Sequence, residues 1–161
     1  MKADPILDRF DPIDLVELDR VTLMSRMDTK YAFGIDRLQE VITTLHPEYR
    51  VLEVDGARGT QYRTLYFDTP GRKHYFDHHN GRTFRSKVRM REYVGSGLCF
   101  LEVKRKTGRG GTDKARMQIP EVRETMDQEQ RNFVALASGC EEPLVPMLWN
   151  GFFRITFVHR E

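Results

Sequence analysis

Residues 85–91 read Arg-Ser-Lys-Val-Arg-Met-Arg, so every second position carries a positive charge. Successive side chains of a β-strand point to opposite faces, and a strand here would place all these cations on one face. A helix would distribute the same residues around its axis. Like charges on one strand face repel one another unless an anion lies among them. The segment therefore predicts both a strand and a polyanionic ligand.

The same alternation returns in four further segments, at residues 26–33, 100–106, 114–119 and 152–157. Each would place charged or polar residues on one face and apolar residues on the other, as an antiparallel strand with one buried face does. Such strands close most simply into an antiparallel β-barrel with a charged interior and helices outside, the inverse of the usual apolar interior. We therefore predict an α+β fold built on such a barrel.

The remaining segments supply flanking helices and further strands. An Asp-Pro start predicts a helix over about 12–23, and an apolar stripe predicts a second over about 36–46. Further strands are expected at about 25–33, 49–54, 62–68 and 147–158, with turns at 55–56 and 80–81. A capping-box pattern from Thr125 to Gln128 opens a third helix that ends near Ala137. The sequence predicts two or three helices around six or seven mostly antiparallel strands.

The charge of the chain is distributed unevenly, although its formal net value is only +2. Residues 82–116 contain eleven Lys or Arg against three Asp or Glu, whereas residues 1–19 and 121–142 are mostly acidic. Such asymmetry indicates a local anion site and not a generally basic nucleic-acid-binding surface, and no RNA-recognition signature is present. The two cysteines have no metal-binding spacing.

The length of 161 residues fits one domain over residues 1–161. No apolar run approaches the roughly 18 residues needed to span a bilayer, and the N-terminus lacks the apolar core of a signal peptide. We therefore expect a cytoplasmic protein without a transmembrane segment.

Five short motifs occur in order along the chain: Arg26-x-Asp28-x-Lys30-Tyr31, Tyr66-Phe-Asp-Thr69, Lys87-x-Arg89-x-Arg91, Leu101-Glu-Val-Lys104 and Lys114-x-Arg116. Together they resemble the vacuolar transporter chaperone (VTC) domain, a branch of the triphosphate tunnel metalloenzyme, or CYTH-like, superfamily. The resemblance runs from about residue 10 to the end of the chain. It implies a tunnel of about eight antiparallel strands, lined by Lys, Arg and Glu, that binds ATP phosphates and growing polyphosphate.

The resemblance also implies roles for nine cations and two carboxylates. The catalytic phosphate ligands would be Lys30, Arg89, Arg91 and Lys104, and the substrate-binding residues would be Lys114, Arg116 and Arg154, joined by Lys87 and Lys106 from the same strand faces. A divalent metal, Mn²⁺ or Mg²⁺, would assist transfer of the γ-phosphate. Asp28 and Glu102 are the candidate carboxylates, either as metal ligands or as groups that orient the cations. The implied partners are ATP and inorganic polyphosphate, with no specific nucleic acid.

The chain departs from the resemblance at its end. Related sequences continue with an Arg-x-Thr-x-Asp strand and a Glu-x-Lys strand, whereas this sequence stops at Glu161. We therefore expect a barrel that is truncated at its C-terminus, although folded proteins avoid open sheet edges. Three readings remain: the chain is a fragment, a second copy or a partner chain completes the barrel, or the tunnel is an open groove.

Three functions are compatible with these patterns. The first is ATP-dependent synthesis of polyphosphate, since rows of Arg and Lys supply the positioning and charge neutralisation that phosphoryl transfer needs. The second is hydrolysis of triphosphates, or cyclisation of ATP, by an enzyme of the same fold. The third is a non-catalytic polyphosphate sensor, which the missing strands favour.

Overall fold

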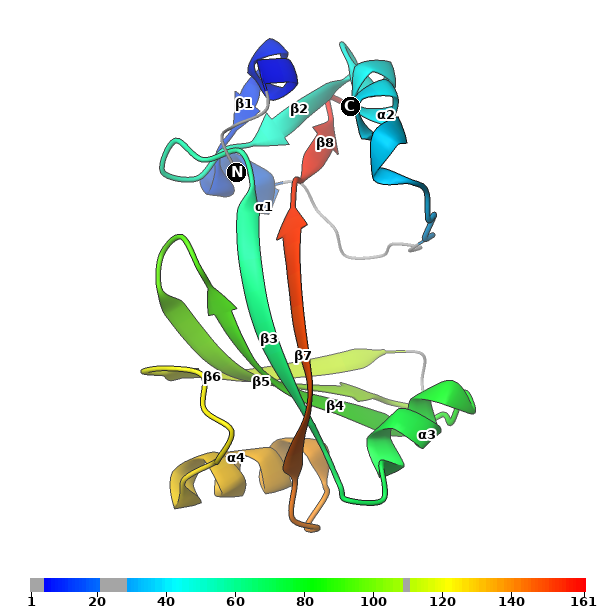
Figure 1. Ribbon diagram of the computed structural model, residues 1–161, viewed down its shortest axis with the longest axis vertical. Coiled ribbons are helices and arrows are strands. Elements are labelled where there is room, and N and C mark those ends of the chain that lie inside the picture. The colour runs from blue at the N-terminus through cyan, green and yellow to red at the C-terminus, as the bar shows by residue number, and fades with distance from the viewer. Residues whose placement is uncertain (1–4, 21–28, 109–110) are drawn as a thin grey trace. The chain divides into compact units, whose positions relative to one another are not determined.

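The computed structural model describes residues 5–20, 29–108 and 111–161 (Figure 1). These residues form an α+β fold, as predicted, in two compact units that we describe separately. The first unit combines the N-terminal part of the chain, as far as Thr60, with Phe153–Glu161, and the second unit is Gln61–Phe152. The expectation of one domain over the whole chain stays a prediction.

The first unit is built on a small three-stranded sheet in the order β1-β2-β8. β1 (Pro12–Ile13) pairs in parallel with β2 (Tyr49–Leu52), which pairs antiparallel with β8 (Phe157–His159). Its helical elements are the 3-10 helices η1 (Pro5–Arg9) and η2 (Ile35–Arg37) and the α-helices α1 (Leu15–Arg20) and α2 (Leu38–Leu45). Its buried core consists of Leu7, Phe10, Ile42 and Val51.

The second unit contains a five-stranded sheet in the order β6-β5-β4-β3-β7. Its strands are β3 (Thr60–Asp68), β4 (Arg85–Tyr93), β5 (Leu98–Lys106), β6 (Thr112–Ile119) and β7 (Val145–Arg154). The pairs β3–β4, β4–β5 and β5–β6 are antiparallel. The alternation in the sequence gives this sheet two different faces, because successive side chains point to opposite sides.

One face of the sheet is apolar and carries the core of the second unit. Leu65, Met90 and Leu101 lie on it and are almost completely buried. Helix α4 (Gln128–Ser138) packs on this face and contributes Val134 to the same core (Figure 1). Burial of this face fixes the register of the strands and thereby directs the charged residues to the opposite face.

The helix boundaries differ in detail from the sequence prediction. α4 begins at a true capping box, but the box joins Asp127 to Gln130, two positions after the predicted pair. The helix ends at Gly139, whose φ of 70° suits glycine. A further helix, α3 (Lys73–His79), was not predicted.

Three strand and helix predictions are wrong in part. Residues 29–33, expected in a strand, are exposed and form no regular element, and residues 25–28 lie outside the described part. The first predicted helix is shortened, because Pro12–Ile13 pair with β2. The last predicted strand is interrupted after Arg154, where the Thr156 carbonyl accepts a hydrogen bond from the Leu52 amide.

The predicted barrel is only partly formed. Within the described ranges the strands make two open sheets, of three and five strands, and no closed barrel. The antiparallel sheet with a charged face is nevertheless present, and this face positions the candidate site.

Candidate functional site

The charged face of the five-stranded sheet is dominated by cations from three adjacent strands. We call it the basic face and define it by Arg85, Lys87, Arg89 and Arg91 of β4, Lys104 and Lys106 of β5, and Lys114 and Arg116 of β6. On the described residues of these three strands, Glu102 is the one carboxylate that shares this face. The strands are in register, so the charges form rows across the sheet. Such an excess of one sign is typical of an anion-binding surface.

Glu102 lies in the middle of the basic face and joins cations of both neighbouring strands. Its Oε2 accepts from Arg89 Nε at 2.7 Å and lies 2.6 Å from Arg89 Nη2. Its Oε1 lies 2.9 Å from Lys114 Nζ. Arg89 also donates from Nη1 to the Tyr66 hydroxyl at 3.3 Å. The cluster therefore links β3, β4, β5 and β6 on one face of the sheet.

The Glu102 carboxylate is 1% exposed. Burial alone raises the pKa of such a carboxyl, but hydrogen bonds and charges from Lys114 and Arg89 outweigh burial and hold the pKa of Glu102 below its usual value. Glu102 is therefore ionised at neutral pH, and its charge compensates two of the cations.

The arginines at one end of the basic face rest on aromatic rings. The Arg91 guanidinium lies 4.9 Å from the ring centroid of Tyr62 and 5.5 Å from that of Phe152, and these two rings stack on each other. The Arg116 guanidinium lies 4.9 Å from the centroid of Phe100. Cation–π contacts fix the planes of these arginines and leave N–H groups available for a ligand.

Three lysines from neighbouring strands form one row of the basic face. Lys104 is opposite Lys87 on one side and opposite Lys114 on the other. Like charges in directly opposite positions destabilise a sheet. Burial, followed by the charge of Arg89, lowers the pKa of Lys104, against the opposing effect of Glu102. The row is thus an unfavourable arrangement that a bound anion would relieve.

The same face is a poor site for a divalent metal. Within the described ranges, no group of three or more His, Cys, Asp or Glu side chains could hold a metal ion. Mg²⁺ needs about six oxygen ligands, whereas Glu102 is surrounded by cations and each of its oxygens lies within 3 Å of one of them. The carboxylate donors described here therefore do not fit the metal that the sequence led us to expect.

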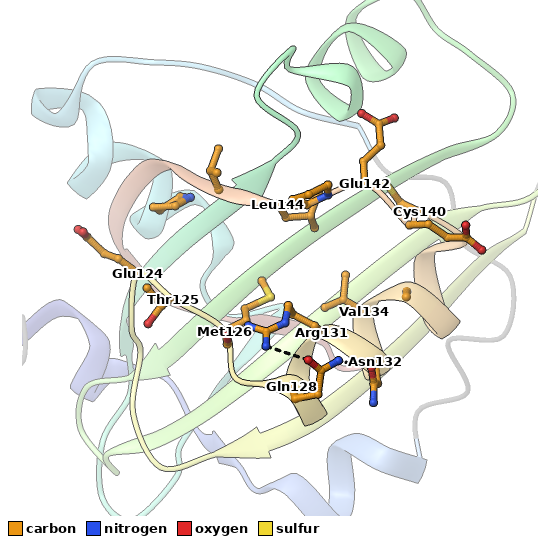
Figure 2. A pocket seen from close by; sticks show the side chains of 15 residues that line it. Glu124, Thr125, Met126, Gln128, Arg131, Asn132, Val134, Cys140, Glu142 and Leu144 are labelled. Carbon is orange, nitrogen blue, oxygen red and sulfur yellow. Dashed lines mark hydrogen bonds between the residues drawn. The ribbon is translucent and has the colours of Figure 1, made fainter.

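One cavity of the second unit differs in chemistry from the basic face. Figure 2 shows a cavity of about 590 Å³ between α4 and the segment that leads into β7. Its charged lining includes Glu124, Glu141 and Glu142, and its one lining arginine, Arg131, donates to Gln128 and to the Met126 carbonyl. An acidic lining repels polyanions, so this cavity does not compete with the basic face as an anion site.

A sequence profile of the VTC domain matches residues 25–161 of this chain. The chain belongs to the VTC domain family. The match covers the whole five-stranded sheet and thus every residue of the basic face. Comparison with curated proteins gave no match.

Two solved structures are similar to this VTC domain. One is a protein from Vibrio parahaemolyticus described as a candidate adenylate cyclase, with 13% identity, a TM-score of 0.43, and coverage of 81% of this chain and 60% of that one. The other is a candidate adenylyl cyclase from Hippeastrum with a dominant triphosphatase activity, with 17% identity, a TM-score of 0.44, and coverage of 80% and 63%. The chain therefore spans less than two thirds of either structure.

The structure brings together seven of the nine cations predicted for the VTC domain site, since these seven all lie on the basic face. Lys30 and Arg154 are exposed and belong to the first unit, so their place in the site stays a prediction. Asp28 lies outside the described residues. The sequence analysis missed Tyr62, Thr64 and Tyr66, although the alternation in 62–68 puts them on one strand face.

The Tyr66-Phe-Asp-Thr69 motif of this VTC domain has a structural role. Asp68 is 6% exposed, and its carboxylate accepts hydrogen bonds from the backbone amides of Thr69, His74 and Tyr75 at 2.7, 2.8 and 2.8 Å. The Thr69 hydroxyl accepts from the Lys73 amide at 3.0 Å. These contacts satisfy the free amides at the start of α3. The motif therefore starts the helix that the sequence analysis did not predict.

None of the helices in the described part of the chain is long and apolar enough to cross a bilayer.

Proposed function

We propose that the basic face of this VTC domain binds a chain of linked phosphates, as tripolyphosphate, as the phosphates of ATP or as polyphosphate. The observation that carries this proposal is the imbalance of charge among the described residues of β4, β5 and β6, which place eight cations and one carboxylate on this face. A phosphate chain carries a negative charge on each unit and would neutralise the row of lysines. The fixed arginines would supply directed hydrogen bonds, which are about twice as strong to an ionised acceptor as to a neutral one.

The finer proposal is ATP-dependent polyphosphate synthesis. In that reaction a terminal oxygen of the acceptor chain attacks the γ-phosphorus of ATP, the bond from the γ-phosphorus to the β-γ bridging oxygen breaks, and ADP leaves. The cations of the basic face would hold the reacting phosphates and compensate the charge on their oxygens, which is most of what phosphoryl transfer asks of a protein. Membership of the VTC domain family supports this reading.

A second candidate function is a polyphosphate sensor without catalysis. The pairing of Glu102 with Arg89 and Lys114 favours it, because this pairing suits anion binding better than metal-assisted transfer. A hydrolase or cyclase that uses the same face is a further alternative, since the cations would hold the same triphosphate in each case.

Calorimetric titration with tripolyphosphate tests the binding proposal. The informative variant is Lys104→Met with Arg116→Gln, because neither residue pairs with the buried Glu102. Each removed charge-assisted contact is worth about 1.5–3 kcal/mol, so affinity should fall at least about 100-fold. The matched control is Arg105→Gln, which removes a charge from the opposite side of the same strand. Equal affinity of the double variant and the wild type would refute the proposal.

Phosphorus NMR of the protein with ATP, Mg²⁺ and a short polyphosphate separates the activities. Growth of the internal-phosphate signal with release of ADP supports synthesis, and orthophosphate or a cyclic nucleotide supports the alternative enzymes. Unchanged ATP in a sample that binds tripolyphosphate supports the sensor.

A further inference from the structure

The position of Glu102 in the basic face leads to an inference that rests on the proposed phosphate binding and assigns a role to this carboxylate. β5 is flanked by β4 and β6, and Glu102 lies opposite Arg89 on one side and Arg116 on the other. A buried carboxylate that merely filled space would be unfavourable, because burying an unpaired charge is costly. Its presence at the centre of the cations therefore needs a specific reason.

Both oxygens of Glu102 lie within ion-pair distance of a cation of the protein, and Oε1 makes this contact without a hydrogen bond. Oε2 accepts a hydrogen bond from Arg89 Nε at 2.7 Å and lies 2.6 Å from Arg89 Nη2, and Oε1 lies 2.9 Å from the Lys114 ammonium. A metal ion at either oxygen would have to displace one of these cations. It would also approach a surface on which all the other charges of the three strands are positive, so Coulomb repulsion opposes its binding.

The pairing leaves both cations able to bind a ligand. Arg89 has five N–H groups, of which one on Nε donates to Glu102 and one on Nη1 donates to the Tyr66 hydroxyl, so further N–H groups remain for a ligand. Lys114 contacts Oε1 of Glu102 as an ion pair, and its side chain is 43% exposed, so its ammonium can also contact a ligand. Without Glu102, these two cations from different strands would repel each other and change their positions.

We propose that Glu102 is a positioning residue and not a metal ligand: it acts as an internal counter-ion that holds Arg89 and Lys114 in place for the phosphate chain. Preorganised donors bind and stabilise charge better than donors that must first be ordered. On this account, a metal that takes part in the reaction enters with the phosphates and is not held by this carboxylate.

The first test follows the Arg89 Nε–H signal by nitrogen NMR in the wild type, in Glu102→Gln and in Glu92→Gln. Glu102→Gln keeps the shape of the side chain and removes its charge. Exchange of the Arg89 Nε proton with solvent should accelerate at least about tenfold in Glu102→Gln, because a charge-assisted hydrogen bond protects it. Glu92 pairs with Arg63 from the same pair of strands, β3 and β4, so its replacement should leave the Arg89 signal unchanged. An unchanged exchange rate in Glu102→Gln would overturn the positioning role.

The second test uses the wild-type chain, so it does not depend on the folding of a variant. Mn²⁺ is added without any phosphate, and paramagnetic broadening of the Leu101, Glu102 and Val103 amide signals is recorded. We expect no selective broadening there, whereas selective broadening at these residues would overturn the proposal. Because no phosphate is present, the result of this test does not depend on tripolyphosphate binding. If calorimetry shows no binding of tripolyphosphate, that result refutes the proposed function and leaves the role of Glu102 toward Arg89 and Lys114 to be decided by the two tests above.

Discussion

The arginines in the two units of this VTC domain differ in the acceptors that surround them. In the first unit, Arg50 donates to the Pro12 carbonyl and pairs with Glu17 at 3.0 Å, and Arg58 pairs with Glu53 at 2.7 Å and donates to two backbone carbonyls. Each of these two arginines therefore has a carboxylate partner and at least one backbone carbonyl acceptor within its own unit. In the second unit, the described residues of β4, β5 and β6 place eight cations and one carboxylate on the basic face, and this carboxylate, Glu102, pairs with Arg89 and Lys114.

This difference indicates what each set of charges does. Cations whose donors are satisfied by the protein stabilise the fold, and their removal leaves acceptors unpaired. Cations that outnumber their acceptors oppose folding and persist where a ligand needs them, as strained features of functional sites do. The following substitutions test whether cations of the first unit stabilise the fold and cations of the basic face bind a ligand.

The largest effect is expected for Lys104→Glu on the basic face. The new carboxylate would lie between Lys87 and Lys114, so the folded state should gain opposite-charge neighbours and its melting temperature should rise. Affinity for tripolyphosphate should fall by more than about 100-fold, because like charges brought together in a contact cost several kcal/mol. Thermal denaturation and calorimetry measure the two quantities. A lower melting temperature together with retained affinity would show that Lys104 has a structural role.

The opposite pattern is expected for Arg58→Met in the first unit. The variant would leave Glu53 and the carbonyls of Leu7 and Phe10 without their donor, and the side chain of Arg58 is only 16% exposed. The free energy of unfolding should fall by about 2–4 kcal/mol. Denaturant titration measures this loss, and calorimetry should show unchanged affinity for tripolyphosphate. A stable variant with weakened binding would place Arg58 among the ligand-binding cations.

Asp68 is a charged residue of the second unit whose partners all belong to the protein, because its carboxylate accepts hydrogen bonds from three backbone amides. It therefore tests the same distinction within one unit. Asp68→Asn keeps the shape but loses the charge at the start of α3, which should reduce the free energy of unfolding by about 1–2 kcal/mol. Chemical denaturation measures the change. We expect tripolyphosphate affinity to stay the same, and a loss of affinity without a loss of stability would contradict the capping role.

The smallest effect concerns pH. Burial, followed by the charge of Arg89, lowers the pKa of Lys104 below its usual 10.5. The unfolded chain therefore binds more protons between the folded pKa and 10.5, so this residue makes the protein more stable as pH rises through that window. A bound polyanion favours the charged lysine, so affinity should fall over the same window by at most about tenfold per pH unit.

Titrations at several alkaline pH values check this prediction for Lys104. The matched variant is Lys104→Met, in which this component of the pH dependence should disappear. The same slope in the variant and the wild type would assign the titration to another group.

The strands of the basic face could be predicted from the sequence because alternation is a local signal. The segments 85–91, 100–106 and 114–119 each put all their charges except that of Arg105 on one side, and β4, β5 and β6 follow them closely. The partners of Glu102 could not be predicted in the same way. Its contacts with Arg89 and Lys114 depend on the register between strands, which no single strand specifies.

Helix α3 was missed because its signal is not in the helix itself. Its seven residues lie between a Pro-Gly pair and an Asn-Gly pair, both typical of turns, and the side chain that satisfies its first amides is Asp68 in the preceding strand. The part of the expected strand that is described, residues 29–33, is absent for the converse reason. Alternation at residues 29–33 predicted a strand, but these residues are exposed and have no packed face to hold an extended conformation.

The most direct test of the central claim follows the arginine Nε–H signals by nitrogen NMR while tripolyphosphate is added. The account predicts that the signals of Arg89, Arg91 and Arg116 shift and saturate together, because all three lie on the basic face. The signals of Arg58 in the first unit and of Arg105 on the opposite side of β5 should stay in place. Shifts at Arg58 or Arg105, with none at the three arginines of the basic face, would contradict the account.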